Sequence, residues 1–231
     1  MPIILSRLVA LVCVAGCARA VASSPSPASP PSHNAAAPTQ RVAPQSPVNG
    51  PLAPFLSQPL IVLPVQAVRG AVPAWSEEMR DARAYLATLD DEIAFAVRER
   101  GLRAKWAFPP DLARAAKRNP TYASDPYAIA IDALAPVEKD ADRMIGEPLA
   151  GQLRALAAIS GARYAFVPVE LRLTPDSVGG VASLRLMVID TRLARLTWKG
   201  DVSADHARTF SPAIAAGLAG RVADLFLTTS R

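Results

Sequence analysis

Few residues in this chain of 231 could carry chemistry, and they do not gather in one stretch. Both cysteines, Cys13 and Cys17, stand in the first seventeen residues, so neither a disulfide nor thiol chemistry is expected further along. A histidine metal site or a Ser-His-Asp relay in the folded part would depend on His206 alone. The sequence also lacks the G-x-S-x-G, Walker and dinucleotide-binding glycine patterns. We therefore assign no catalytic, cofactor-binding or metal-binding residue.

The acidic run Asp90-Asp91-Glu92 could suggest a metal site or acid-base chemistry. Consecutive side chains on a helix point in diverging directions, which favours a solvated helix face instead. A secreted envelope hydrolase that uses paired carboxylates stays open as the alternative function, because spacing in sequence does not give spacing in space. A deep pocket with two facing carboxylates would support that alternative.

The amino terminus has the pattern of an export signal. Met1–Arg7 carries one positive side chain and Leu8–Gly16 is apolar, a run far shorter than the about 20 residues that span a bilayer. The following Val14-Ala15-Gly16-Cys17 resembles a bacterial lipobox, in which the cysteine receives a diacylglyceryl thioether and a further acyl chain such as palmitate. Cys17 is therefore the predicted lipidation site, with residues 1–17 as signal peptide and lipobox.

Two features refine this prediction. The sequence Ala18-Arg19-Ala20 also fits a signal-peptidase site, and cleavage there would release a secreted protein without cysteine. Ala18 directly after the cysteine resembles the sorting signal for the outer membrane. We expect an outer-membrane protein that is lipid-anchored on the periplasmic face, because several acyl chains anchor firmly where one does not.

Residues 18–54 form a segment of unusual composition. They contain nine Pro, nine Ala and six Ser and no Asp, Glu, Lys or aromatic residue, so they cannot bury enough apolar surface to offset the entropy of ordering. We interpret this segment as a disordered tether, which could extend over roughly 115 Å as polyproline II. The single folded domain is predicted at residues 55–231.

The charge of the chain argues against nucleic acid as a partner. The net charge is +5, but three of the 25 Lys and Arg residues and none of the 20 acidic residues precede residue 55. The folded part therefore carries 22 positive and 20 negative side chains, whereas nucleic-acid binding requires a strongly basic face. Within it, the charged residues of segment 98–118 are mostly basic, and those of segment 121–148 are mostly acidic. These segments either neutralise each other in one molecule or join neighbouring subunits.

Three alternating segments between Arg163 and Val202 predict an antiparallel three-stranded meander. A period of two places the apolar residues of the first segment together on one face of the sheet. In the same way, it places those of the last segment together on one face. The first set is Ala165, Val167, Val169, Leu171 and Leu173, and the second is Leu196, Trp198, Gly200 and Val202.

The remaining pattern predicts an α/β fold. An apolar strand at Pro59–Val65, a helix from Ser76 as N-cap to Arg100, and a strand at Leu102–Phe108 form a parallel β-α-β start. Further helices are expected at 111–118, 149–160 and 211–227, and a loop with one helical turn at 122–145. The prediction is a mixed sheet of about five strands with three to four packing helices.

This order of elements, with ARYAFVPVELRL, LRLMVIDTR and LTWKGDV in the meander, resembles a group of bacterial envelope lipoprotein domains. The group includes the TolB amino-terminal domain, the curli-secretion lipoprotein and the penicillin-binding-protein activator lipoproteins. The most specific piece is Asp190-Thr191-Arg192 followed by Trp198, which is similar to the group's "DxxTGxxxW" hairpin. Leu193 and Ala194 occupy the turn where the group often has Gly.

The resemblance implies a non-catalytic adaptor or assembly factor, and hence no enzyme and no cofactor. The implied partner is another envelope protein or a second copy of the chain, with the membrane reached through the lipid anchor. The sequence does not identify a small-molecule ligand.

Overall fold

The structure is a computed structural model that describes residues 48–101, 106–134, 137 and 144–229. The predicted signal peptide with Cys17, and the predicted tether up to residue 47, lie outside the described residues. Among the described residues, no helix has the length and apolar character needed to cross a membrane.

A mixed six-stranded sheet forms the centre of the fold, which confirms the predicted fold class. Strand β2 pairs in parallel with β4 on one side and β5 on the other, and β5, β6 and β7 form the predicted antiparallel meander. A short strand that the sequence did not predict, β3, pairs with β5 beyond the end of β2. The strands are β2 Leu60–Val62, β3 Val68–Gly70, β4 Trp106–Ala107, β5 Tyr164–Pro175, β6 Gly180–Asp190 and β7 Arg195–Ser203.

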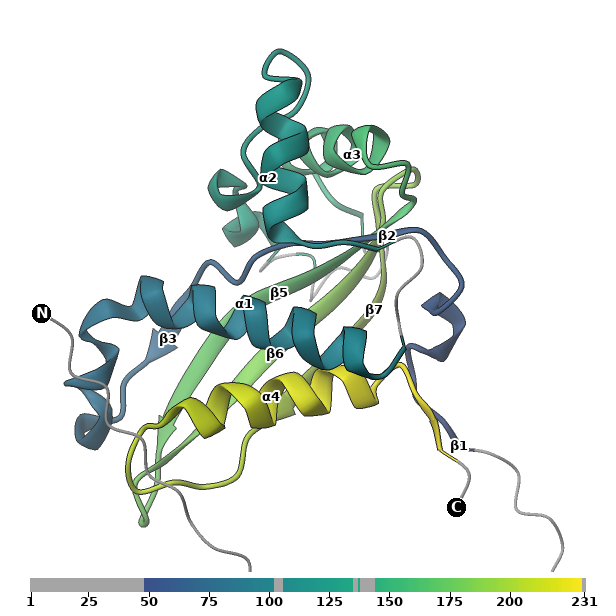
Figure 1. Ribbon diagram of the computed structural model, residues 1–231. Helices are drawn as coiled ribbons and strands as arrows, with labels where there is room; N and C mark the ends of the chain where they lie inside the picture. Colours follow the sequence, from purple (N-terminus) through teal and green to yellow (C-terminus); the bar gives the residue numbers. More distant parts are fainter. Residues whose placement is uncertain (1–47, 102–105, 135–136, 138–143, 230–231) are drawn as a thin grey trace, which may run out of the picture. The chain divides into compact units, whose positions relative to one another are not determined.

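Within the described residues, four α-helices cover this sheet. Figure 1 shows α1 and α4 side by side across one face, while α2 and α3 gather at the end where β2 lies. Short 3-10 turns, five in the described part of the chain, connect the elements. The helices are α1 Ala82–Glu99, α2 Pro109–Arg118, α3 Leu149–Ile159 and α4 Pro212–Asp224, and the turns are η1 Ala53–Phe55, η2 Pro73–Trp75, η3 Glu78–Asp81, η4 Pro126–Ala128 and η5 Ile131–Leu134.

The two faces of the sheet contribute to two separate hydrophobic cores. On one face, Phe166 and Val188 pack with apolar residues of α1 and α4, such as Leu218. On the other face, Val167 and Ile189 pack with apolar residues of α2 and α3. Neighbouring residues of β5 and β6 therefore serve opposite cores, and both faces are buried along much of these strands.

Two β-bulges correct the predicted faces of the meander. In β5 the register shifts between Pro168 and Glu170, so Ala165 and Val167 face the α2–α3 core while Leu171 faces the α1–α4 core. A second shift in β7 inserts Thr197, whose Oγ1 donates to the Val188 carbonyl at 2.7 Å. One extra residue reverses every later side chain of a strand. The prediction that each set shares a single face is therefore wrong.

The bulge in β7 separates Leu196 from Trp198. Leu196 is buried in the α2–α3 core, whereas Trp198 packs partly buried against the other core together with Val202. The ring of Trp198 lies over Gly200, where an added Cβ would come within 2.6 Å of it. Gly200 thus provides the space that the indole occupies.

The first helix and the start of the domain also differ from the sequence prediction. The N-cap of α1 is Asp81 and not Ser76: the Asp81 carboxylate accepts a hydrogen bond from the Ala84 amide at 3.0 Å. Short 3-10 turns replace the first predicted helical turn. Leu52 is fully buried in the α1–α4 core, so folded structure begins before residue 55. The first and last described residues are paired, because β1 (Val48–Asn49) forms an antiparallel pair with β8 (Thr228–Thr229).

Candidate functional site

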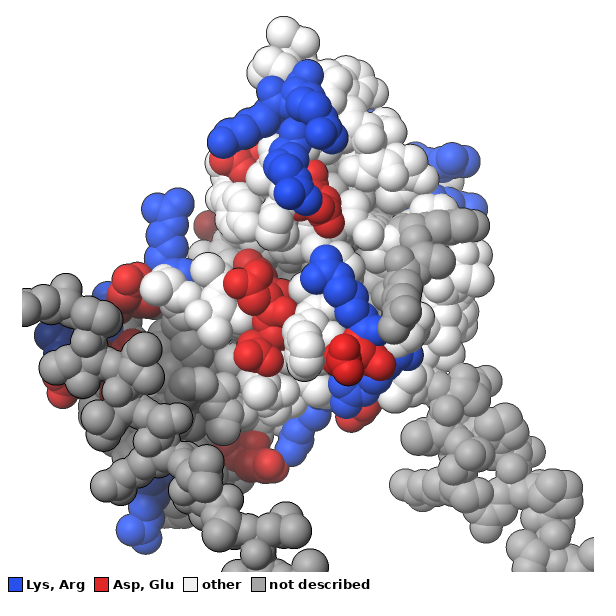
Figure 2. All heavy atoms as spheres, in the orientation of Figure 1, with Lys and Arg blue, Asp and Glu red and all other residues white. Residues whose placement is uncertain are grey.

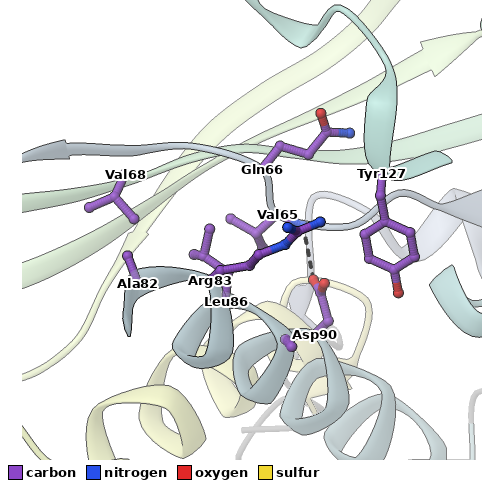
Figure 3. A pocket seen from close by; sticks show the side chains of 9 residues that line it. Val65, Gln66, Val68, Ala82, Arg83, Leu86, Asp90 and Tyr127 are labelled. Carbon is purple, nitrogen blue, oxygen red and sulfur yellow. Dashed lines mark hydrogen bonds between the residues drawn. The ribbon is translucent and has the colours of Figure 1, made fainter. Parts of the chain in front are cut away.

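A cavity of about 680 Å³ opens between α1, the chain that joins β2 to β3, and η4 (Figure 3). Volumes of this order are typical of sites for small organic groups. Its walls are largely apolar, with a few polar side chains between them. The lining residues are Val65, Gln66, Val68, Ala82, Arg83, Leu86, Ala87, Asp90 and Tyr127. We call it the Asp90 cavity.

Asp90 is the carboxylate in the wall of this cavity, and the residue is only 8% exposed. Its Oδ1 accepts a hydrogen bond from the Val65 backbone N–H at 2.9 Å. Burial raises the pKa of Asp90 to about 7, against the opposing effect of the Val65 N–H; the negative charge of Asp91 raises it further. Asp90 therefore changes its charge near neutral pH.

The position of Asp90 corrects the prediction that the acidic run is a solvated helix face. Asp91 is exposed, but Asp90 lies on the buried stripe of α1, four residues after Leu86 and three before Ile93. The sequence contained this signal, because those spacings place the three residues on one face of a helix. An acidic residue within an otherwise apolar helical stripe indicates a buried carboxylate.

Tyr127 forms the opposite wall and is held by η4. The Asp125 carboxylate caps this turn by accepting from the Tyr127 N–H at 3.0 Å, and Gln66 Nε2 donates to the Pro126 carbonyl at 2.8 Å. Burial raises the pKa of the Tyr127 phenol, and the charges of Asp90, Asp91 and Asp125 raise it further. The ring therefore lies within the electrostatic reach of three carboxylates.

The Asp90 cavity has one carboxylate in its wall and not two. The hydrolase alternative required two facing carboxylates, so this cavity does not supply the arrangement that would have supported it. Arg83 is the positively charged residue that lines the cavity, and within the described residues it forms no ion pair with Asp90. The described part of the chain contains no group of three His, Cys, Asp or Glu side chains arranged to hold a metal ion.

His206 lies elsewhere on the molecule, on an exposed loop after β7. Its Nδ1 contacts the carboxylate of Asp176 in the loop between β5 and β6. The hydrogen bond with His206 lowers the pKa of Asp176, and the Gly179 and Val178 amides contribute to the lowering. This pair joins two loops and does not line the Asp90 cavity.

The hairpin motif behind the family resemblance forms a hydrogen-bonded turn between β6 and β7. One oxygen of Asp190 accepts from the Arg192 and Leu193 amides at 3.0 and 3.2 Å. The other accepts from the Arg163 guanidinium at 2.7 and 3.0 Å. Ala194 follows with a φ of 48°, a conformation that explains why glycine is common at this turn. The motif residues build the turn and do not form a ligand site.

The predicted charge segments are only partly described. Figure 2 shows a group of basic side chains over α2 and acidic side chains over α1. Within the described residues no ion pair joins the basic segment 98–118 to the acidic segment 121–148. Their charges pair elsewhere: Arg100 with Asp224 at 3.0 Å, Arg69 with Asp132 at 2.9 Å, and Arg114 with Asp111.

No family model matches this sequence, and no curated protein is similar to it. Solved structures give weak likenesses. The LpoB C-terminal domains from Salmonella enterica and from Escherichia coli are each 14% identical, cover 67% of this chain and 96% of theirs, and have TM-scores of 0.31. The PelC dodecamer from Paraburkholderia phytofirmans is 13% identical, covers 79% and 96%, and has a TM-score of 0.38.

At these identities and TM-scores the likenesses carry no argument about the function of this chain. The functional conclusion must rest on the sequence signals and on the surface around the Asp90 cavity.

Proposed function

We propose that the chain is a non-catalytic lipoprotein, anchored through Cys17 to the periplasmic face of the outer membrane, that serves as an adaptor or assembly factor for another envelope protein. The lipobox residues Val14–Cys17 and the Pro-, Ala- and Ser-rich segment that follows support the anchor and the tether. The similarity of the Asp190-to-Trp198 hairpin to envelope lipoprotein domains supports the adaptor role.

One structural observation carries the protein-binding part of the proposal: two large aromatic rings are exposed on the side of the domain that bears the Asp90 cavity. Tyr127 is 44% exposed and Phe95 is 61% exposed. Asp91 lies one helical turn before Phe95 on α1, and its negative charge raises the pKa of Tyr127. Asp91 therefore lies near both rings, which belong to one surface. Exposed aromatic residues beside a cavity are typical of protein-binding surfaces. We call this surface, formed by Ala87, Asp91, Phe95 and Tyr127, the α1–η4 face.

Site-specific photo-crosslinking in cells tests this proposal. A photoreactive amino acid at Phe95 or Tyr127 is expected to capture the same envelope protein, in the outer-membrane fraction. The matched control is Val178, which is 51% exposed on the loop between β5 and β6 and should not capture it. Cys17→Ser should release the protein into the soluble periplasmic fraction and reduce capture.

The outcomes separate the parts of the proposal. A product of twice the chain's mass would make a second copy the partner. Equal capture from Val178, or none from Phe95 and Tyr127, would contradict the binding surface. A mature protein that begins at Val21 by mass spectrometry would contradict the lipid anchor and leave the surface untouched.

A further inference from the structure

The Asp90 cavity combines apolar walls with an unpaired carboxylate. Ala82, Leu86 and Ala87 of α1 face Val65 and Val68 across it, and these side chains offer carbon surface to a ligand. An apolar wall alone would select only by shape. The polar groups at the end of the cavity determine the chemistry of what enters.

At that end, Asp90 retains hydrogen-bonding capacity. Its Oδ1 receives the Val65 N–H, and no described residue donates to its Oδ2. A buried carboxylate normally receives a full set of donors or a paired cation. Asp190 has both, with two backbone amides and the Arg163 guanidinium, so this protein can satisfy a buried aspartate where the fold alone requires it.

The surroundings of Asp90 favour a positive ligand over a negative one. Asp91 on α1 and Asp125 before η4 act on Tyr127 together with Asp90. Tyr127 presents an aromatic ring beside the carboxylate (Figure 3), and such rings attract cations through their electron-rich faces. Arg83 on α1 is the opposing charge in the wall, and it is exposed and forms no ion pair with Asp90.

We propose that the Asp90 cavity binds an organic cation, namely an ammonium or guanidinium group on an apolar stem. The charged group lies between the Asp90 carboxylate and the Tyr127 ring. The stem lies along Ala82, Leu86 and Val65. This inference goes beyond the adaptor function and does not depend on it, because the ligand chemistry follows from the cavity alone.

The binding is expected to depend on pH. The ligand binds ionised Asp90, and because the pKa of Asp90 is about 7, the ionised fraction rises about tenfold between pH 6 and pH 8. The charged and titratable groups that face Asp90 are Asp91 and Arg83 on α1 and Asp125 and Tyr127 at η4. The pKa of Tyr127 is raised, so its phenol stays neutral over this range and does not reverse the trend. Affinity should therefore rise up to about tenfold over this range.

Titration by ¹H–¹⁵N NMR tests the proposal on the full chain with Cys17→Ser, which removes only the acylated thiol. The probes are n-butylammonium and Nα-acetyl-lysine methylamide, with neutral Nα,Nε-diacetyl-lysine methylamide as the matched control. The Val65 amide is the reporter, because it donates directly to Asp90. We expect saturable shifts of this resonance with the two cations and none with the neutral control.

Two variants complete the test. Asp90→Asn keeps an oxygen for the Val65 N–H but removes the charge, and should weaken cation binding at pH 8 at least tenfold. Arg83→Ala removes the competing positive charge and should strengthen it. Equal binding of the neutral probe, unchanged affinity in Asp90→Asn, or no response to either cation would each overturn the proposal.

The two cationic probes also distinguish the source of the ligand. Tighter binding of the capped lysine would indicate a side chain of a protein, because its peptide groups add contacts at the mouth of the cavity. Tighter binding of n-butylammonium would indicate a free small amine. Either result supports the cation site.

Discussion

Asp90 and Asp190 are two buried aspartates whose environments differ in almost every respect. Asp190 is 2% exposed and Asp90 8%. Burial by itself would raise the pKa of both carboxyls. At Asp190 the Arg163 guanidinium and the Leu193 and Arg192 amides outweigh the effect of burial, so the pKa is lowered. At Asp90 the single Val65 amide does not outweigh burial, so the pKa rises to about 7.

The difference separates a structural carboxylate from one available to a ligand. Asp190 stabilises the turn between β6 and β7 and ties it to the start of β5, where the Arg163 carbonyl also accepts from the Thr191 amide at 3.0 Å and hydroxyl at 2.8 Å. Asp90 holds only the segment after β2 and faces the open cavity. A buried acid that the fold leaves incompletely paired lowers stability when it ionises, and a cationic ligand can offset that cost.

The largest effect is expected from Asp190→Ala. It leaves the Arg192 and Leu193 amides without their acceptor and removes the Arg163 ion pair, so the free energy of unfolding should fall by about 3 to 5 kcal/mol. Urea denaturation would measure this as a lower midpoint with an unchanged slope. Asp190→Asn is the control, since it keeps an oxygen for the turn amides and should lose less. Equal losses in the two variants would show that the turn amides contribute nothing.

Asp90→Asn should act in the opposite direction. Because the pKa of Asp90 is raised in the fold, the folded state binds more protons than the unfolded state, and wild-type stability falls as the pH rises from about 4 to about 7. The amide cannot ionise, so at pH 8 the variant should be more stable than wild type by up to about 4 kcal/mol, the equivalent of a pKa raised by about three units. Near pH 4 the two should be equal.

Urea denaturation at several pH values measures this difference. Asp91→Asn is the matched control on the adjacent, exposed position of α1, where little pH-dependent gain is expected. An Asp90→Asn variant that is less stable than wild type at pH 8 would show that the charge of Asp90 is required by the fold, and the contrast with Asp190 would disappear.

The sequence predicted the elements that its periodicities describe. The parallel β-α-β start, the meander and the four helices follow from apolar spacing, because burial of an amphipathic face largely decides local structure. The faces of β5 and β7 did not follow, because Val169 and Thr197 look like ordinary members of an alternating pattern. A bulge is set by pairing with a neighbouring strand, which a single segment does not reveal.

The candidate site was predictable only in part. The helical spacing of Asp90 with Leu86 and Ile93 indicates that Asp90 is buried. The sequence does not reveal which residues are its neighbours in the cavity. Tyr127 lies 37 residues further along, in a stretch without periodicity, and η4 brings it to α1 through the Asp125 cap and the Gln66 contact. Strand β3 was missed because its three residues, Val68–Gly70, are too short to show alternation.

Arg163→Met should have the smallest effect on stability of these substitutions. It tests whether the Arg163 guanidinium keeps the pKa of Asp190 low. The Arg163 side chain is 43% exposed and Asp190 keeps its two turn amides, so the removal of Arg163 should lower stability at pH 7 by less than Asp190→Ala does. The folded-state pKa of Asp190 is lowered, so the stability it contributes is present above the unfolded pKa and is lost as the pH falls through the folded value. Without Arg163 that pKa rises, and acid unfolding should begin at a higher pH, by less than about one unit.

Tryptophan fluorescence during acid titration would measure this midpoint. Arg154→Met is the control, because Arg154 lies 3.8 Å from Glu147 and both side chains are at least half exposed, so the midpoint should not move. A midpoint that also stays fixed in Arg163→Met would mean that the two turn amides alone hold the pKa of Asp190 down. Asp90 and Asp190 would then differ by the number of backbone donors, one against two, and not by the presence of a cation.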